Sequence, residues 1–222
     1  MKLRTMFSGI AVATVMAAAL SAPAQATESA PEKLQDETDV VYTPVEPTSD
    51  EVLIDGQPTD IAVMPGFDAS APAVVVDGTG QPTSVGDVSI VSAGGEISAL
   101  SLVAPTDIEA LAGCGWTNWV APGTGTYHTS VPGCSVIGVS PDAQVSYSWT
   151  VDSLSNGSAC LQGRGYKARH LPGGGTTYDE YFGALGCGTS GGGALSLGEV
   201  ASTKVVKALA TSTPVGAAGM FQ

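Results

Sequence analysis

The stretch Gln-Val-Ser-Tyr-Ser-Trp-Thr-Val at residues 144–151 decides the fold class, because apolar and hydroxyl side chains alternate in it without a break. A period of two residues is the signature of a β-strand with one buried face. Val145, Tyr147 and Trp149 share a face, and we expect that face to point into a core. The stretch therefore predicts a β-strand at the centre of a β-rich domain.

The residues that follow predict more strands and turns. Asn156-Gly157 is a strong hairpin signal because both residues tolerate a positive φ. We therefore expect Ser158–Lys167 to return beside residues 144–151, and Thr203–Thr211 to form a later strand. Two Gly-rich stretches predict loops, Pro172–Gly175 and Gly191–Gly193. No helical periodicity extends beyond two turns, so residues 113–222 are expected to form an all-β domain, a small sandwich or a compact barrel.

The four cysteines all lie in this half, at Cys114, Cys134, Cys160 and Cys187. An even number suits two disulfides in an oxidising compartment, and four cysteines allow three pairings. Because local closures suit successive hairpins, we favour Cys114–Cys134 and Cys160–Cys187, each stabilising the fold by roughly 3 kcal/mol. The alternative, a metal site of four thiolates, is disfavoured by the wide spacings and the absence of a C-x-x-C motif.

The first 26 residues have the three parts of a secretory signal peptide. Lys2 and Arg4 give a positive start, Met6–Leu20 is apolar, and Ala24-Gln25-Ala26 fits the A-x-A cleavage pattern. The apolar run is shorter than the roughly 20 residues that span a bilayer, which disfavours the alternative of an uncleaved anchor. We therefore expect cleavage after Ala26 and a secreted, extracellular protein with no membrane attachment. The Ala-rich leader, acidic spacer and Gly-rich domain with cysteines resemble secreted actinobacterial proteins.

The remaining chain divides into two parts of different composition. Residues 27–112 contain 16 acids and one base, whereas residues 113–222 contain five of each. All three tryptophans and five of the six tyrosines lie in the second part. Because aromatic side chains supply large buried areas, the second part is the one equipped to build a core.

The acidic part is itself expected to have two segments. Residues 27–51 are rich in acids, Pro, Ser and Thr, and such a composition predicts disorder. Residues 52–112 hold short apolar runs between turn signals, which predict weak strands. These runs are Val52–Ile54, Ala73–Val76, Val88–Val91 and Ile97–Val103. A short helix is expected to begin at Pro105 and to end near Gly113. Whether residues 52–103 fold alone or add strands to the second part stays open.

One loop resembles a known catalytic motif. Gly186-Cys187-Gly188-Thr189-Ser190-Gly191-Gly192 is similar to the Cys-x-Gly-Asp-Ser-Gly-Gly loop of chymotrypsin-like serine proteases, over about seven residues. The resemblance implies Ser190 as nucleophile, His128 (or His170) as base and Asp142 (or Asp152) as orienting acid. Thr189 replaces the Asp of the family loop, and 62 residues between His128 and Ser190 are too few for the two-barrel protease scaffold.

Two groups of side chains are candidates for binding. Exposed aromatic rings can hold a sugar, and basic side chains an anionic partner or the chain's own acidic segment. The aromatic candidates are Trp116, Trp119, Tyr178 and Tyr181, and the basic ones are Arg164, Lys167 and Arg169. The competing interpretation is structural: most aromatic rings of a domain this small are needed in its core, and a short basic stretch is commonly a solvated strand end.

Several functions are disfavoured by the same composition. The acidic chain would repel nucleic acid. Two His and few acids at unsuitable spacings predict no metal site, and no motif predicts a cofactor. Asp179 and Glu180 are neighbours in a predicted strand and point to opposite faces, which is unsuitable for paired-carboxylate catalysis.

Three hypotheses remain. The first is a secreted, non-enzymatic binding or interaction module for a cell-wall glycan or a protein partner. The second is a proprotein in which residues 27–112 form an acidic propeptide of the C-terminal domain. The third is an extracellular serine hydrolase that uses Ser190.

Overall fold

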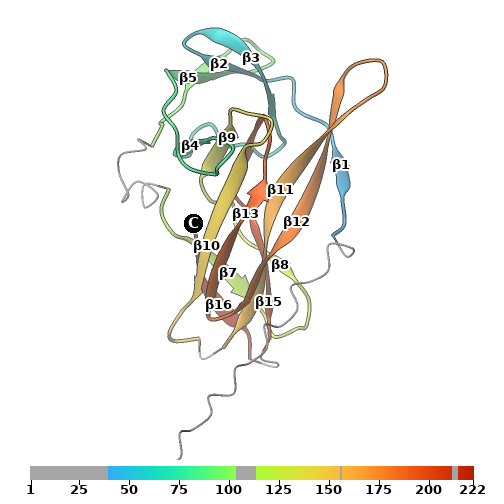
Figure 1. The fold of residues 1–222 in the computed structure, drawn as a ribbon. Coiled ribbons are helices and arrows are strands. Elements are labelled where there is room, and N and C mark those ends of the chain that lie inside the picture. Colours follow the sequence, from blue (N-terminus) through green and yellow to red (C-terminus); the bar gives the residue numbers. More distant parts are fainter. Residues whose placement is uncertain (1–39, 104–113, 156, 212–214) are drawn as a thin grey trace, which may run out of the picture. The chain divides into compact units, whose positions relative to one another are not determined.

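The computed structural model describes residues 40–103, 114–155, 157–211 and 215–222, and within these ranges it contains strands, turns and loops but no helix (Figure 1). The all-β expectation is therefore confirmed. The expected helix over 105–111 and the residues 27–39 lie outside the described ranges.

The strands form three sheets. The five-stranded sheet has the order β1 (Thr43–Val45), β12 (Thr176–Gly188), β11 (Ala159–His170), β15 (Val206–Ala210) and β8 (His128–Thr129). The four-stranded sheet has the order β13 (Ser190–Ser196), β10 (Gln144–Val151), β16 (Ala217–Phe221) and β7 (Thr117–Ala121). The seven-stranded sheet has the order β4 (Ala73–Val76), β9 (Ser135–Gly138), β14 (Val200–Thr203), β3 (Gln57–Val63), β2 (Glu51–Ile54), β5 (Val88–Val91) and β6 (Ile97–Ala99).

Strand β10 has the bounds and the orientation that its alternation predicts. Val145, Tyr147 and Trp149 are buried, and Ser148 is exposed. The rings of β10 belong to a core that also contains Leu161 from β11. The five- and four-stranded sheets thus share one core, as the layers of a β-sandwich do.

The expected hairpin between residues 144–151 and 158–167 is wrong. β10 pairs with β13 and β16, whereas β11 pairs with β12 and β15, so the two strands lie in different sheets. The Asn-Gly signal reports only on local backbone freedom. Both strands have an apolar face, and placing them in opposite sheets lets those faces meet in the same core.

The two Gly-rich stretches have different structures. Gly173, Gly174 and Gly175 have positive φ angles and form the predicted turn between β11 and β12. Gly191–Gly193, predicted to be a loop, belongs to strand β13 and pairs with Trp149, Ser148 and Tyr147 of β10. The physical reason is space: a Cβ atom on Gly191 would lie 2.8 Å from Nε1 of Trp149. The glycine makes room for the indole ring.

The seven-stranded sheet contains strands of both the N-terminal region (residues 52–103) and the C-terminal region (residues 113–222). β4 pairs in parallel with β9, and β14 pairs in parallel with β3. A second core cluster contains Val52 and Val75 from this region together with Ile137 and Ala201 from the C-terminal region. The question left open by the sequence is therefore answered: residues 52–103 do not form a sheet of their own.

Part of the segment expected to be disordered is a strand. Within residues 27–51, β1 pairs with β12, so that Thr43 lies opposite Glu180 and Val45 opposite Tyr178. The Nζ atom of Lys167 donates a hydrogen bond of 2.9 Å to the hydroxyl of Tyr42, and lies 4.9 Å from the centroid of that ring. These contacts offset the cost of ordering a polar segment, which composition alone does not reveal.

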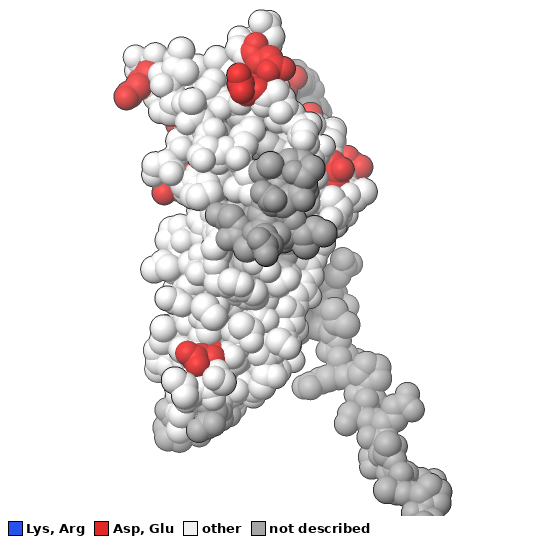
Figure 2. All heavy atoms as spheres, turned by 90° about the vertical axis from the view of Figure 1, so that its left-hand side faces the viewer, with Lys and Arg blue, Asp and Glu red and all other residues white. Residues whose placement is uncertain are grey.

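Charge is distributed unevenly over the surface. Figure 2 shows the side of the molecule where β10 lies in Figure 1, and on it acidic atoms gather mainly at the upper end, where β2, β3 and β5 lie. No basic side chain is visible in that view. The described basic residues of the C-terminal region are Arg164, Lys167, Arg169, Lys204 and Lys207, all on or next to strands β11 and β15 of the five-stranded sheet.

Both disulfides form in the favoured pairing. Cys114 is joined to Cys134, and Cys160 on β11 to Cys187, its cross-strand partner on β12. The loops that they close span 20 and 27 residues. In the part of the chain that the structure describes, no helix is long and apolar enough to cross a bilayer.

Candidate binding pocket

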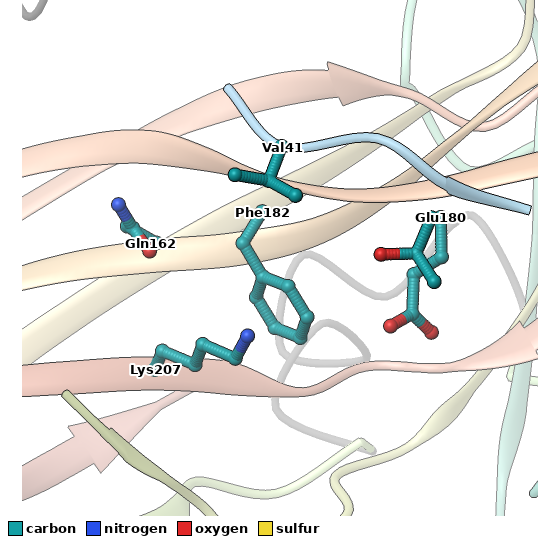
Figure 3. Close-up of a pocket in the computed structure, with 6 residues that line it drawn as sticks. Val41, Gln162, Glu180, Phe182 and Lys207 are labelled. Carbon is teal, nitrogen blue, oxygen red and sulfur yellow. The ribbon is translucent and has the colours of Figure 1, made fainter. Parts of the chain in front are cut away.

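An open pocket with a volume of about 210 Å³ lies on the outer face of the five-stranded sheet, beside β1 (Figure 3). Residues of four strands and of the segment leading into β1 form its walls. They are Val41, Thr43, Gln162, Glu180, Phe182 and Lys207. The volume is below the roughly 300–1,000 Å³ of pockets for drug-sized ligands, so this pocket suits a single small ring or one unit of a longer chain.

Strand register brings these side chains together. Gln162 of β11 lies opposite Lys207 of β15, and Thr43 of β1 lies opposite Glu180 of β12. Because side chains alternate between the two faces of a strand, Glu180 and Phe182 share the outer face of β12. Hydrogen bonds of the sheet ladders therefore fix the backbone beneath the walls formed by β1, β11, β12 and β15, whereas Val41 precedes the first paired residue of β1.

The ring of Phe182 stands in the middle of the pocket, with Lys207 beside it (Figure 3). The Nζ atom of Lys207 lies 3.7 Å from the centroid of the ring, a cation–π contact. Lys207 has neither an ion pair nor a side-chain hydrogen bond to any residue that the structure describes. The ammonium group of Lys207 therefore rests on an aromatic face, and its N–H groups are available to donate hydrogen bonds to a ligand.

Glu180 is in contrast engaged by its neighbours. Its Oε2 atom lies 3.6 Å from Nη1 of Arg164 and accepts a hydrogen bond of 3.5 Å from the hydroxyl of Tyr166. Ser202 of β14 donates a hydrogen bond of 3.0 Å to that same hydroxyl. Burial raises the pKa of Tyr166, so this phenol keeps its proton and remains a donor at neutral pH. The network holds the carboxylate in one place at the pocket wall.

Arg164, the cross-strand partner of Phe182, is mostly buried and held by hydrogen bonds. Arg164 donates a hydrogen bond to the carbonyl oxygen of Thr203, and its own carbonyl oxygen accepts one of 2.8 Å from the hydroxyl of Tyr147. The Nε atom of Arg164 is buried and has no partner among the described residues. Arg164, a predicted binding residue, thus acts mainly by positioning Glu180, and its side chain is only 13% exposed.

This arrangement suits recognition of a small polar ring. An aromatic side chain offers apolar contact, and an amide, a carboxylate and an ammonium offer hydrogen bonds around it. No group of three or more His, Cys, Asp or Glu side chains that could hold a metal ion occurs in the described ranges.

Most of the aromatic residues predicted to bind are buried. Trp119 is only 1% exposed, and Tyr178 and Tyr181 are each 8% exposed, so these three predictions of exposure are wrong. Trp119 packs over Gly219, where a Cβ atom would lie 2.6 Å from the indole. The hydroxyl of Tyr181 is also engaged inside the fold, where it accepts a hydrogen bond of 2.9 Å from the backbone N–H of Ser196. Trp116 is exposed at 44%, but it does not line the pocket.

The remaining basic candidates have partners within the fold. Lys167 contacts Tyr42, and the Nε atom of Arg169 lies 2.6 Å from a carboxylate oxygen of Asp179. Asp179 is buried, whereas its neighbour Glu180 lies at the pocket, so the two carboxylates are on opposite faces as predicted. The basic stretch thus contacts Tyr42, a residue of the acidic N-terminal segment that was one of its expected partners.

The protease-like residues are not assembled into a triad. Ser190 pairs with Thr150 at one end of β10, whereas Asp142 lies in the turn before Gln144, and Gln144 is about 20 Å from Thr150 at 3.3 Å per residue. Nε2 of His128 is hydrogen-bonded to the hydroxyl of Thr124 at 2.8 Å. The alternative base His170 contacts Thr176 at the far end of β11. Asp152, the alternative acid, accepts a hydrogen bond from the backbone N–H of Leu154.

Sequence reasoning did not single out the pocket. Its polar walls, Gln162, Glu180 and Lys207, come from the consecutive strands β11 and β12 and from the later strand β15, and only the register of the sheet makes them neighbours. A signal existed in part: Glu180 and Phe182 are two residues apart in a strand and therefore share a face.

Comparison of the chain with protein-family models, with curated proteins and with solved structures gave no match.

Proposed function

We propose that this protein is a secreted, non-enzymatic binding module that holds one sugar unit of an extracellular glycan, such as a cell-wall polysaccharide, in the Phe182 pocket. The observation that carries the proposal is the placement of Phe182 among Gln162, Glu180 and Lys207 on one face of the five-stranded sheet. Sugars offer apolar C–H groups to an aromatic side chain and hydroxyl groups to polar side chains at the same time.

Two further features support an extracellular site of action. The expected signal peptide at residues 1–26 predicts export, and the two disulfides are compatible with an oxidising compartment. Mass spectrometry of the protein recovered from culture medium tests this part of the proposal. We expect a mature chain that begins at Thr27. Recovery of the chain only from inside the producing cells would refute export.

Binding to glycans tests the pocket itself. Purified protein is titrated by calorimetry with soluble oligosaccharides of wall glycans, both neutral and acidic. Phe182→Leu keeps the apolar bulk at the pocket and removes the aromatic ring, so we expect it to weaken binding by about tenfold. Trp116→Ala is the matched control, because Trp116 is an exposed aromatic residue that does not line the pocket.

The outcomes separate the candidates. Binding that is lost in Phe182→Leu and kept in Trp116→Ala supports the pocket. Binding that is lost in Trp116→Ala alone would move the site to that tryptophan and reject the pocket. Absence of binding to every glycan would reject the proposed function.

A further inference from the structure

We propose that the ligand of the Phe182 pocket carries a carboxylate, and that Lys207 is the residue that binds it. This inference rests on the proposed function, because it names the class of sugar that the same site takes. The juxtaposition that points to it is an ammonium group without an oxygen partner inside an open, polar pocket.

The local charge balance favours an anion. Glu180 is the carboxylate in the pocket wall, and Arg164 lies 3.6 Å from it, so these two charges offset each other. Lys207 adds a positive charge that no described carboxylate neutralises. Arg164, Glu180 and Lys207 together carry a net charge of +1, in a chain whose formal net charge is −13. A local positive charge on an otherwise acidic protein favours an anionic ligand at that site.

The environment of Lys207 also makes its charge effective. Its side chain is partly buried, and the ring of Phe182 covers one side of the ammonium at 3.7 Å from the centroid. A partly desolvated cation binds an anion more strongly than a cation in bulk water does. The opposite residue Gln162 places an amide donor at the same wall. A carboxylate can accept hydrogen bonds from both groups at once.

The rest of the pocket restricts the class further. Glu180 accepts hydrogen bonds only, so it suits hydroxyl or amide groups of a ligand and would repel a second anionic group. A ligand with one carboxylate and several hydroxyl groups on a compact ring fits both ends of the pocket. Sugar acids have this composition, and neutral sugars and simple carboxylic acids each lack half of it.

A matched trio of ligands tests the inference on the whole protein. The probes are N-acetylmuramic acid, its methyl ester, and N-acetylglucosamine, with affinity measured by ligand-observed NMR titration. The ester has nearly the size of the acid without its charge. We expect the acid to bind about tenfold more tightly than the ester, as charge-assisted hydrogen bonds do. Raising the salt concentration should reduce this difference.

Variants assign the effect to Lys207. Lys207→Gln should remove the preference for the acid over the ester, and Lys207→Arg should retain it. Ser148→Glu changes the net charge equally at an exposed position of the four-stranded sheet, away from the pocket, so the preference for the acid should be unchanged. Equal binding of acid and ester by the native protein would overturn the inference and leave the proposed function standing. Failure of all three sugars together with every wall glycan would overturn both.

Discussion

The Nζ atom of Lys204 lies 2.8 Å from the carbonyl oxygen of Ser146 and 5.5 Å from the centroid of the Tyr147 ring. Lys204 is buried at the point where the chain leaves β14 in the seven-stranded sheet and enters β15 in the five-stranded sheet. A buried ammonium with one carbonyl acceptor is costly, and this burial lowers the pKa of Lys204 from 10.5 to about 8.

The lowered pKa predicts how stability depends on pH. Between pH 8 and pH 10.5 the folded protein has released the Lys204 proton while the unfolded chain still holds it, so the free energy of unfolding should rise with pH. The rise should amount to about 3 kcal/mol at most. Burial also raises the pKa of Tyr147, so above about pH 10 the unfolded chain loses a phenol proton that the folded protein keeps, and stability should fall.

Urea unfolding midpoints from pH 7 to pH 11 check this prediction. The native protein should be most stable between about pH 9 and pH 10. Lys204→Met removes the charge and keeps much of the volume, so its stability should not rise between pH 8 and pH 10. Parallel pH curves for the two proteins would contradict the assignment to Lys204.

Because Trp149 packs against strand β13, we predict that adding one methyl group at Gly191 destabilises the fold. A Cβ atom at Gly191 would meet the indole at 2.8 Å, so Gly191→Ala should lower the free energy of unfolding by about 1–3 kcal/mol. Gly193→Ala, two residues away in the same strand, would meet only Leu185 Cδ2 at 3.5 Å and should cost much less. Thermal unfolding of the two variants provides the comparison, and equal losses would argue against the close packing.

The shared seven-stranded sheet predicts the fate of a cleaved chain. If a protease cuts within residues 104–113, the two fragments should remain together, because β3 pairs with β14 and β4 pairs with β9. Their separation would expose Ile137 and Ala201, which are fully buried. Gel filtration before and after addition of urea measures this. Release of residues 27–103 without denaturant would instead support a removable propeptide.

The disulfides make a prediction that needs no variant. Titration of the unreduced protein with a thiol reagent in denaturant should detect no free sulfhydryl, because the four cysteines are paired. Reduction should lower the free energy of unfolding by several kcal/mol, with loops of 20 and 27 residues each contributing about 3 kcal/mol. Four reactive thiols in the unreduced protein would contradict the pairing.

Local patterns predicted the local parts of this molecule. The alternation around Tyr147 and Trp149 identified β10 and its buried face, and the spacing of the cysteines favoured the observed pairing. The partners of each strand were not predictable in this way. The chain changes sheets between β10 and β11. The Asn-Gly motif did not predict this, because a turn motif carries no information about which sheet the next strand joins.

The candidate site shows the same limit. Trp119 was one candidate for a surface ring, but its strand places it over Gly219, a residue 100 positions away in the sequence. Phe182 is surrounded by polar walls only because β11, β12 and β15 are neighbours. Contacts between distant segments depend on the register of the sheets, and single-sequence patterns do not encode that register explicitly.

The parallel pairing of β3 with β14 has a consequence for how the protein folds during and after its synthesis. Ala62 of β3 pairs with Val200 of β14, so almost the entire polypeptide must be synthesised before this edge of β3 is paired. Long-range closures of this kind make folding slow and leave hydrogen-bonding strand edges open to unwanted association in the meantime. The acidic residues of the early half carry like charges that keep neighbouring nascent molecules apart during this delay.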